Sequence, residues 1–120
     1  MRDHRKLIAF QLADDLALEI YKLTATFPKE EVYGLTSQMR RAAVSVPSNV
    51  VEGCARETDK EYLRFLDIAF GSLKELHYQF GLSVRLAYLD LSTHHELEPK
   101  IDECEKVLAS LIRALRKPNP

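Results

Sequence analysis

Residues 35–53 read LTSQMRRAAVSVPSNVVEG, an apolar stripe of helical spacing with a proline inside it. The stripe continues in phase on both sides of Pro47, which indicates one helix rather than two. An interior proline loses a backbone hydrogen bond and clashes with the carbonyl four residues earlier, here that of Ala43. The pattern therefore predicts a helix over residues 35–54 that is kinked at Pro47. The stripe consists of Leu35, Met39, Ala42, Ala43, Val46 and Val50.

Apolar residues of helical spacing also precede and follow this stretch. They predict helices at about residues 8–26, 59–89 and 94–116, joined by short connections. Pro28 ends the first of these helices, because a proline disfavours helix at the residue before it. The last helix carries a seam whose steps alternate between four and three residues, as in a heptad repeat. Its members are Leu97, Ile101, Cys104, Leu108, Leu111 and Leu115.

Two helix starts carry capping signals. Thr58 with Glu61 has the spacing of a capping box at the start of the third helix. Thr93 with Glu96 has the same spacing before the fourth. Pro99 suits the first turn of that helix better than its interior.

Four helices with short connections predict an all-α fold, an up-and-down antiparallel four-helix bundle. No segment alternates apolar and polar residues as a strand does. With 46% hydrophobic and 29% charged residues, the 120 residues are sufficient for one core. We therefore expect a single domain over residues 1–120.

The sequence also bears on location and redox state. It has no apolar run of bilayer-spanning length, and its start, MRDHRKLIAF, lacks the features of a signal peptide. We expect a cytoplasmic protein without a membrane segment. Cys54 and Cys104 lie far apart in the sequence and do not form a CxxC pattern, so we expect two buried thiols.

Polar residues around Pro47 are candidates for a structural cluster. The side chains of Ser45, Ser48 and Asn49 can hydrogen-bond to backbone groups that the proline leaves unpaired. If the second and third helices face each other there, Glu52 and Glu75 can join the same network. The alternative interpretation is a ligand or partner site at the kink.

The apolar stripe of the third helix is unusually broad. Leu63 and Phe70 widen it beyond the face that one neighbour would cover, which predicts a contact with a second chain. These two residues are the candidate oligomer interface.

Charge is distributed unevenly in the predicted bundle. One end collects the start of the first helix, the end of the second, the start of the third and the end of the fourth. It holds nine basic and five acidic side chains, a formal charge of +4; the whole chain is −1, so the remainder carries −5. Such an end attracts phosphate. The alternative is that the lysine and arginine residues at the end of the fourth helix only interact favourably with the dipole of that helix at its C-terminus. The candidate nucleic-acid-binding residues are Arg2, Arg5, Lys6, Arg56, Lys60, Arg64, Arg113, Arg116 and Lys117.

Patterns typical of catalysis do not occur in the sequence. There is no nucleophile elbow, phosphate loop or zinc spacing, and no Glu-x-x-His pair of the di-iron bundles. The group around His94 and Glu98 suits a helix cap better than a metal site, and His77 is expected at the surface or an interface. We therefore predict a protein that is not an enzyme and uses no cofactor or metal.

Three ordered motifs resemble one family. They are FPKEEVYG at residues 27–34, the stretch at residues 35–53, and FLDIAFGSLKEL at residues 65–76. Together they resemble the four-helix-bundle family named for proteins encoded in the intervening sequence of 23S ribosomal RNA. That family also resembles the accessory protein of diversity-generating retroelements.

The resemblance implies an assembly and a class of partner. Members form rings of five subunits, and the retroelement accessory proteins bind nucleic acid and a reverse transcriptase through a basic surface. For the intervening-sequence members no enzymatic activity is established. The leading hypothesis is a non-catalytic homo-oligomer that binds RNA, DNA or a nucleoprotein partner through its basic end. The alternative is a protein-interaction scaffold without nucleic-acid binding.

Overall fold

A computed structural model describes residues 2–117 and shows four long helices. Helix α1 spans Ile8–Thr24, α2 Leu35–Cys54, α3 Asp59–Arg85 and α4 Leu91–Arg116. Two short 3-10 helices accompany them, η1 at His4–Lys6 before α1 and η2 at Lys29–Glu31 before α2. Within residues 2–117 no strand occurs, so the all-α prediction is confirmed.

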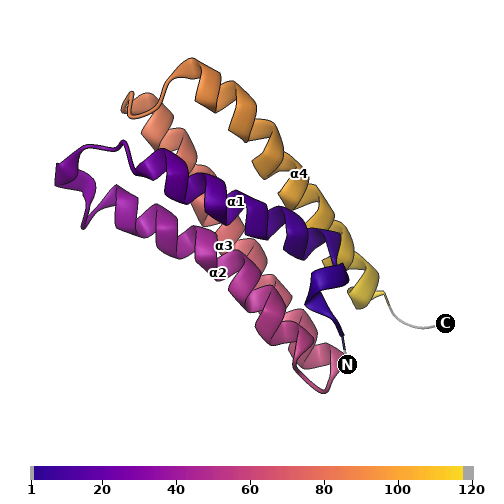
Figure 1. Cartoon of the computed structure of the whole chain (residues 1–120). Helices are drawn as coiled ribbons and strands as arrows, with labels where there is room; N and C mark the ends of the chain where they lie inside the picture. Colours follow the sequence, from indigo (N-terminus) through magenta and orange to yellow (C-terminus); the bar gives the residue numbers. More distant parts are fainter. Residues whose placement is uncertain (1, 118–120) are drawn as a thin grey trace.

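The helices run up and down and form one four-helix bundle (Figure 1). Each helix packs against its neighbours in the chain, and α1 also packs against α4, which closes the bundle. The molecule measures 51 × 25 × 20 Å. The start of α1, the α2–α3 turn and the end of α4 lie together at one end, as the sequence predicts (Figure 1). We call this the basic end.

The core follows the predicted apolar stripes. Small alanines of α1 and α2 allow close packing, and large aliphatic side chains from α3 and α4 complete the interior. The first four members of the heptad seam are buried, and Leu111 and Leu115 are partly buried against the core, while Ile112, outside the predicted seam, is buried as well. Fully buried large side chains include Ile20, Met39, Leu66, Leu73, Leu76, Phe80, Ile101 and Leu108.

Both Pro47 and Pro99 lie inside helices. Helix α2 continues through Pro47 from Leu35 to Cys54, so one helix rather than two is confirmed. The kink itself stays a prediction. Pro99 was expected in a first turn, and this was wrong, because α4 begins at Leu91 and the proline lies in its interior.

The connection between α3 and α4 differs from the prediction. Helix α3 ends at Arg85 rather than residue 89. Helix α4 begins three residues earlier than expected, because the side chain of Asp90 caps it by accepting a hydrogen bond from the Thr93 amide at 2.8 Å. The capping box of Thr93 with Glu96 was therefore wrong. The cap at Thr58 is confirmed by a 3.1 Å hydrogen bond from the Glu61 amide.

The two cysteines are free and buried, as expected. Burial raises the pKa of the Cys104 thiol to about 12, so it carries no thiolate at neutral pH. No helix within residues 2–117 combines the length and apolar character needed to cross a bilayer.

Candidate functional sites at the basic end and between α3 and α4

Three arginines gather around two aromatic rings at the basic end. The Arg2 guanidinium lies 4.2 Å from the centre of the Tyr62 ring. Arg56, at the end of α2, and Arg64, on α3, each lie 4.6 Å from the centre of the Phe65 ring. Arg2 also donates a 2.8 Å hydrogen bond to the Arg56 carbonyl, which ties the N-terminal segment to the α2–α3 turn. Cation–π contacts thus hold the three guanidiniums close together.

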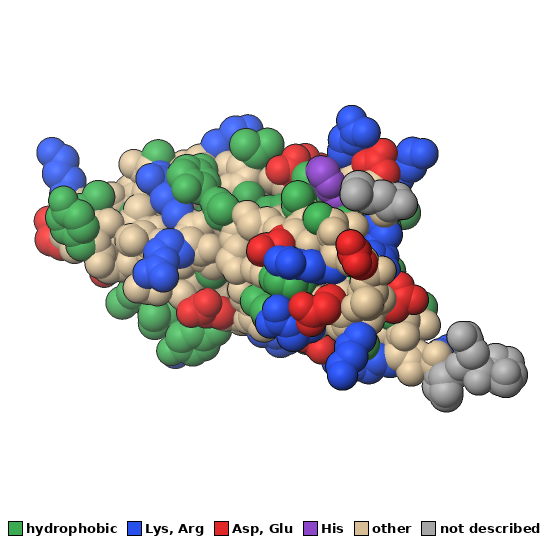
Figure 2. All heavy atoms as spheres, turned by 90° about the horizontal axis from the view of Figure 1, so that it is seen from below, with side chains coloured by type: hydrophobic (Ala, Val, Ile, Leu, Met, Phe, Trp, Pro, Cys, Tyr) green, Lys and Arg blue, Asp and Glu red, His purple; other side chains and the backbone are tan. Residues whose placement is uncertain are grey.

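Five of the nine candidate nucleic-acid-binding residues form ion pairs with carboxylates. These ion pairs are Arg2–Asp59, Arg5–Asp3, Arg56–Glu52, Arg64–Glu61 and Arg116–Asp67. Asp67 was not counted from the sequence, and including it lowers the formal charge of this end from +4 to +3. Figure 2 shows Lys and Arg side chains mixed with Asp and Glu side chains where α1 starts and α4 ends. The end is therefore less basic than the sequence alone suggested.

The other four cations have no carboxylate partner among the described residues. Lys6, Lys60, Arg113 and Lys117 are exposed on η1, α3 and the end of α4. Arg113 donates only to the hydroxyl of Ser110, at 3.1 Å. These side chains are available to an anion without breaking an ion pair of the fold.

A hollow of about 600 Å³ lies at the α2–α3 turn of the same end. It is lined by Arg2, Ala55, Arg56 and Glu57. Both guanidiniums at its wall are paired with carboxylates, and Glu57 adds a further acidic residue, so a phosphate group would have to displace these ion pairs there.

The predicted polar cluster around Pro47 is only partly assembled. The Asn49 amide donates to the Ser45 carbonyl at 2.8 Å and to the Ser45 hydroxyl at 3.0 Å. The Ser45 hydroxyl in turn lies 2.8 Å from that of Ser72 on α3, a partner that the sequence analysis did not anticipate. This network joins α2 to α3, but it does not bond to the carbonyl of Ala43.

Three of the five cluster residues lie outside that network. Glu52 pairs with Arg56 at 3.1 Å, one helical turn away. Ser48 and Glu75 are exposed. The prediction that Ser48 and Glu75 belong to the cluster was wrong, because both residues are exposed to solvent. Glu52 is also outside the cluster, because its carboxylate pairs with Arg56.

The predicted interface residues Leu63 and Phe70 are half-buried and pack against the core of their own chain. Other apolar side chains are more exposed. Tyr21, Val32 and Val44 line a groove of about 620 Å³ over α2 and the end of α1, together with polar residues that include Arg40 and Arg41. Next to it, Tyr33 is 95% exposed. We call Tyr21, Val32, Tyr33 and Val44 the α2 apolar surface.

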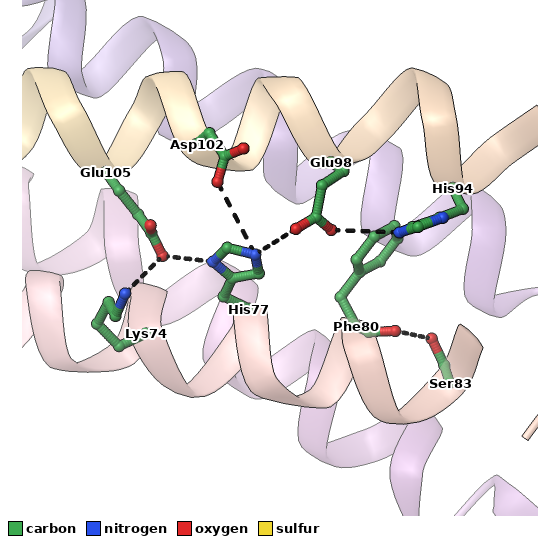
Figure 3. A network of polar contacts seen from close by, with 8 residues as sticks. All are labelled: Lys74, His77, Phe80, Ser83, His94, Glu98, Asp102 and Glu105. Carbon is green, nitrogen blue, oxygen red and sulfur yellow. Dashed lines mark hydrogen bonds and ion pairs between the residues drawn. The ribbon is translucent and has the colours of Figure 1, made fainter. Parts of the chain in front are cut away.

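A histidine–carboxylate cluster lies in the seam between α3 and α4 (Figure 3). His77 Nδ1 is 2.7 Å from Glu105 Oε2, and His77 Nε2 is 2.7 Å from Glu98 Oε1. Asp102 Oδ1 lies 3.9 Å from the same Nε2. Lys74 Nζ is 3.5 Å from Glu105 Oε2. The imidazole is thus surrounded by three carboxylates of α4.

The surroundings of His77 set its charge. Burial alone lowers the pKa of this histidine, but the hydrogen bonds to Glu98 and Glu105 outweigh it and raise the pKa above its usual value. His77 therefore links the two helices by its hydrogen bonds to Glu98 and Glu105, which favour its protonated form. It was expected at the surface or an interface, and its bridging contact was missed. The spacing of Glu98, Asp102 and Glu105 on one helical face was the available signal.

Comparisons with known proteins agree with the fold. The sequence profile described as 23S rRNA-intervening sequence protein matches residues 5–110. A crystal structure of a protein with unknown function, from the S23 ribosomal protein family of Bacteroides thetaiotaomicron VPI-5482, has a TM-score of 0.81 to this chain. The two are 20% identical over 88% of this chain and 96% of that chain, a likeness that concerns the fold alone. A search of curated proteins gave no significant match.

Proposed function

The chain belongs to the family of 23S rRNA-intervening sequence proteins, and on that premise we propose a non-catalytic, oligomeric bundle that binds RNA or DNA through its basic end. The observation that carries the proposal is the group of four exposed cations without carboxylate partners, Lys6, Lys60, Arg113 and Lys117. They lie at the same end as the hollow lined by Arg2 and Arg56.

The chemistry of these groups favours a phosphate backbone over a single small ligand. Exposed cations spread over one end match the regularly spaced negative charges of a phosphate backbone, and their contacts with phosphate release counterions that are condensed on the nucleic acid. The guanidiniums that lean on Tyr62 and Phe65 add planar donors for phosphate oxygens. No base-reading element is required for such binding.

Assembly into a ring of five, which the family resemblance implies, would multiply this charge. Five copies of the +3 end would carry roughly +15 formal charge on one rim. A reverse transcriptase or another nucleoprotein partner would then approach the same rim. The oligomer therefore strengthens the proposed interaction without adding any new contact to a single chain.

Fluorescence anisotropy with a structured RNA and a duplex DNA at low salt tests nucleic-acid binding directly. A variant with Lys60→Glu, Arg113→Glu and Lys117→Glu should bind much more weakly, because it reverses three of the four cations that lack a carboxylate partner among the described residues. None of the three is in an ion pair there, so the fold should be retained. The matched control is Lys22→Glu, Lys29→Glu and Arg85→Glu, three exposed cations at the opposite end. Absence of binding of the wild-type protein to both ligands at micromolar concentration would refute the proposal.

The second candidate function is a protein-interaction scaffold, favoured by the α2 apolar surface. Its simplest occupant is another copy of this chain. Light scattering should show an oligomer for the wild-type protein and a smaller species for Val44→Glu, which places a charge in the groove. Ile68→Glu, at an exposed apolar position outside the groove, is the control. A wild-type monomer at micromolar concentration would contradict the predicted oligomer.

A further inference from the structure

We propose that His77, Glu98 and Asp102 bind a divalent transition-metal ion, for which Zn²⁺ is the best match. The ligand atoms of these three residues all lie within 4.8 Å of one another. The site spans the α3–α4 seam (Figure 3), and none of its residues is one of the nine candidate cations of the basic end. It therefore does not depend on the proposed nucleic-acid binding.

The helices hold the three donors without any loop. Glu98 and Asp102 are four residues apart on α4, so they share one face, and His77 projects toward that face from α3 (Figure 3). Sites on helices of a bundle are held by the packing of the backbone itself. A half-exposed Asp102 side chain, 49% accessible, leaves an open coordination position for water.

Two of the three distances between the ligand atoms lie on either side of the value that a tetrahedral ion requires, and no pair of these atoms is more than 4.8 Å apart. Zn–N and Zn–O bonds of about 2.0 Å place neighbouring ligand atoms roughly 3.3 Å apart. His77 Nε2 is now 2.7 Å from Glu98 Oε1 and 3.9 Å from Asp102 Oδ1. Small side-chain rotations would equalise the two distances. The ion would take the place of the proton between Nε2 and Glu98, which leaves to solvent.

The other nitrogen of His77 is already fixed as a metal-binding histidine requires. Glu105 lies 2.7 Å from Nδ1, where its carboxylate can accept the Nδ1 proton, and once the proton on Nε2 has left, the Nε2 lone pair faces Glu98 and Asp102. Glu105 is the most buried carboxylate of the group, with a side chain only 14% exposed, and Lys74 supports its charge. On the other side, His94 Nε2 lies 3.7 Å from the second oxygen of Glu98.

Charge in the cluster favours a divalent cation. Three carboxylates face one lysine, a formal charge of −2 when the imidazole is neutral. A divalent ion brings that sum to zero. One imidazole nitrogen with two carboxylate oxygens is a donor set for Zn²⁺ and related ions, whereas Mg²⁺ and Ca²⁺ prefer oxygen ligands alone.

Calorimetric titration of the chelator-treated full chain with Zn²⁺ tests the site. We expect one ion per chain, with Asp102→Asn and His77→Gln each weakening the affinity at least ~10-fold and Glu105→Gln weakening it ~10–100-fold. Circular dichroism on each variant checks that the helices are retained. His95→Gln and Glu103→Gln, exposed residues on the same helix, should leave the affinity unchanged.

A second measurement separates coordination from adventitious binding. In ¹⁵N NMR spectra of the imidazoles, Zn²⁺ should shift the Nε2 signal of His77 while Nδ1 keeps its proton. No stoichiometric Zn²⁺ binding, an unmoved His77 signal, or equal losses in the His95 control would each overturn the proposal. In those cases the cluster would be an ion-pair network only.

Discussion

At the residue scale, Ala87 explains why α3 ends where it does. Its φ of 60° is the one positive value among the non-glycine residues described. The Tyr88 amide donates a hydrogen bond to the Ser83 carbonyl, and the Ala87 amide donates one to the Val84 carbonyl, both at 3.0 Å. These two bonds form a Schellman motif, a helix end in which glycine normally takes the left-handed position. An alanine there pays a steric penalty that glycine avoids.

Ala87→Gly should therefore stabilise the protein. Relief of the left-handed conformation is expected to raise the free energy of unfolding by about 1 kcal/mol. Chemical denaturation measures it. The control is Ala55→Gly at the end of α2, where φ is −83° and glycine should destabilise. A destabilised Ala87→Gly protein would show that this conformation carries no penalty.

Glu31 is a second single residue with a structural role, at the end of the bundle opposite the basic one. Its carboxylate accepts a 2.7 Å hydrogen bond from the Tyr88 hydroxyl and a 3.0 Å bond from the Leu35 amide at the start of α2. These bonds favour the ionised form, so they hold the pKa of Glu31 below its usual value. One side chain thus connects η2 to α2 and to the α3–α4 connection.

The stabilisation from Glu31 should depend on pH. Because its folded pKa is depressed, it stabilises the fold above the unfolded pKa, and that stabilisation is lost as pH falls through the folded pKa. Glu31→Gln should melt lower than wild type at pH 7, and the two should converge in acid. Glu30→Gln, at an exposed neighbour, is the control. A gap in melting temperature that stays constant with pH would contradict this assignment.

At the scale of elements, glycines report how closely α2 and α3 approach. A Cβ added at Gly53 would lie 3.0 Å from the Phe65 Cβ and 3.3 Å from the Tyr62 carbonyl oxygen. A Cβ added at Gly71, in the middle of α3, would meet nothing within 4 Å. The first glycine is therefore needed for packing, and the second only weakens its helix.

The same substitution should have opposite effects at these two glycines. Gly71→Ala should stabilise by about 0.5–1 kcal/mol, through helix propensity alone. At Gly53 the crowding should exceed that gain, so that Gly53→Ala destabilises by about 1 kcal/mol. Urea denaturation of both variants under one condition measures the contrast. Equal stabilisation by both would mean that the two helices can separate at no cost.

At the scale of the whole molecule, the distribution of ion pairs determines how much charge is available to a ligand. Five cations of the basic end serve the fold, and four remain without a carboxylate among the described residues. Exposed pairs contribute little stability, so the paired arginines can exchange a carboxylate for a phosphate at small cost. In the proposed complex with nucleic acid, these four cations set the minimum number of phosphate contacts per chain.

The salt dependence of nucleic-acid binding should report that number. Four phosphate contacts per chain predict a slope of log K against log salt of about −3.6 for duplex DNA. The triple reversal at Lys60, Arg113 and Lys117 should leave a slope of at most about −1. Anisotropy titrations at several salt concentrations measure it. A slope unaffected by the reversal would place the contacts elsewhere on the molecule.

Much of the fold follows from short-range patterns. The apolar stripe of residues 35–53, the seam beginning at Leu97 and the Thr58 cap each involve residues within a few turns of one another. Helix type and the buried face depend on such spacings, so they could be read directly. The α3–α4 connection could not, because Ala87 gives no glycine signal and Asp90 competes with Thr93 as a cap.

The candidate sites depend on contacts between distant residues. Arg116 meets Asp67 across 49 positions and His77 meets Glu105 across 28, and these pairs exist only once α3 packs against α4. The sequence therefore established a bundle with cations collected at one end, because spacing and chain direction are enough for that. Packing alone determined which cations stay free and which carboxylates surround His77, since it sets the rotation of each helix about its axis.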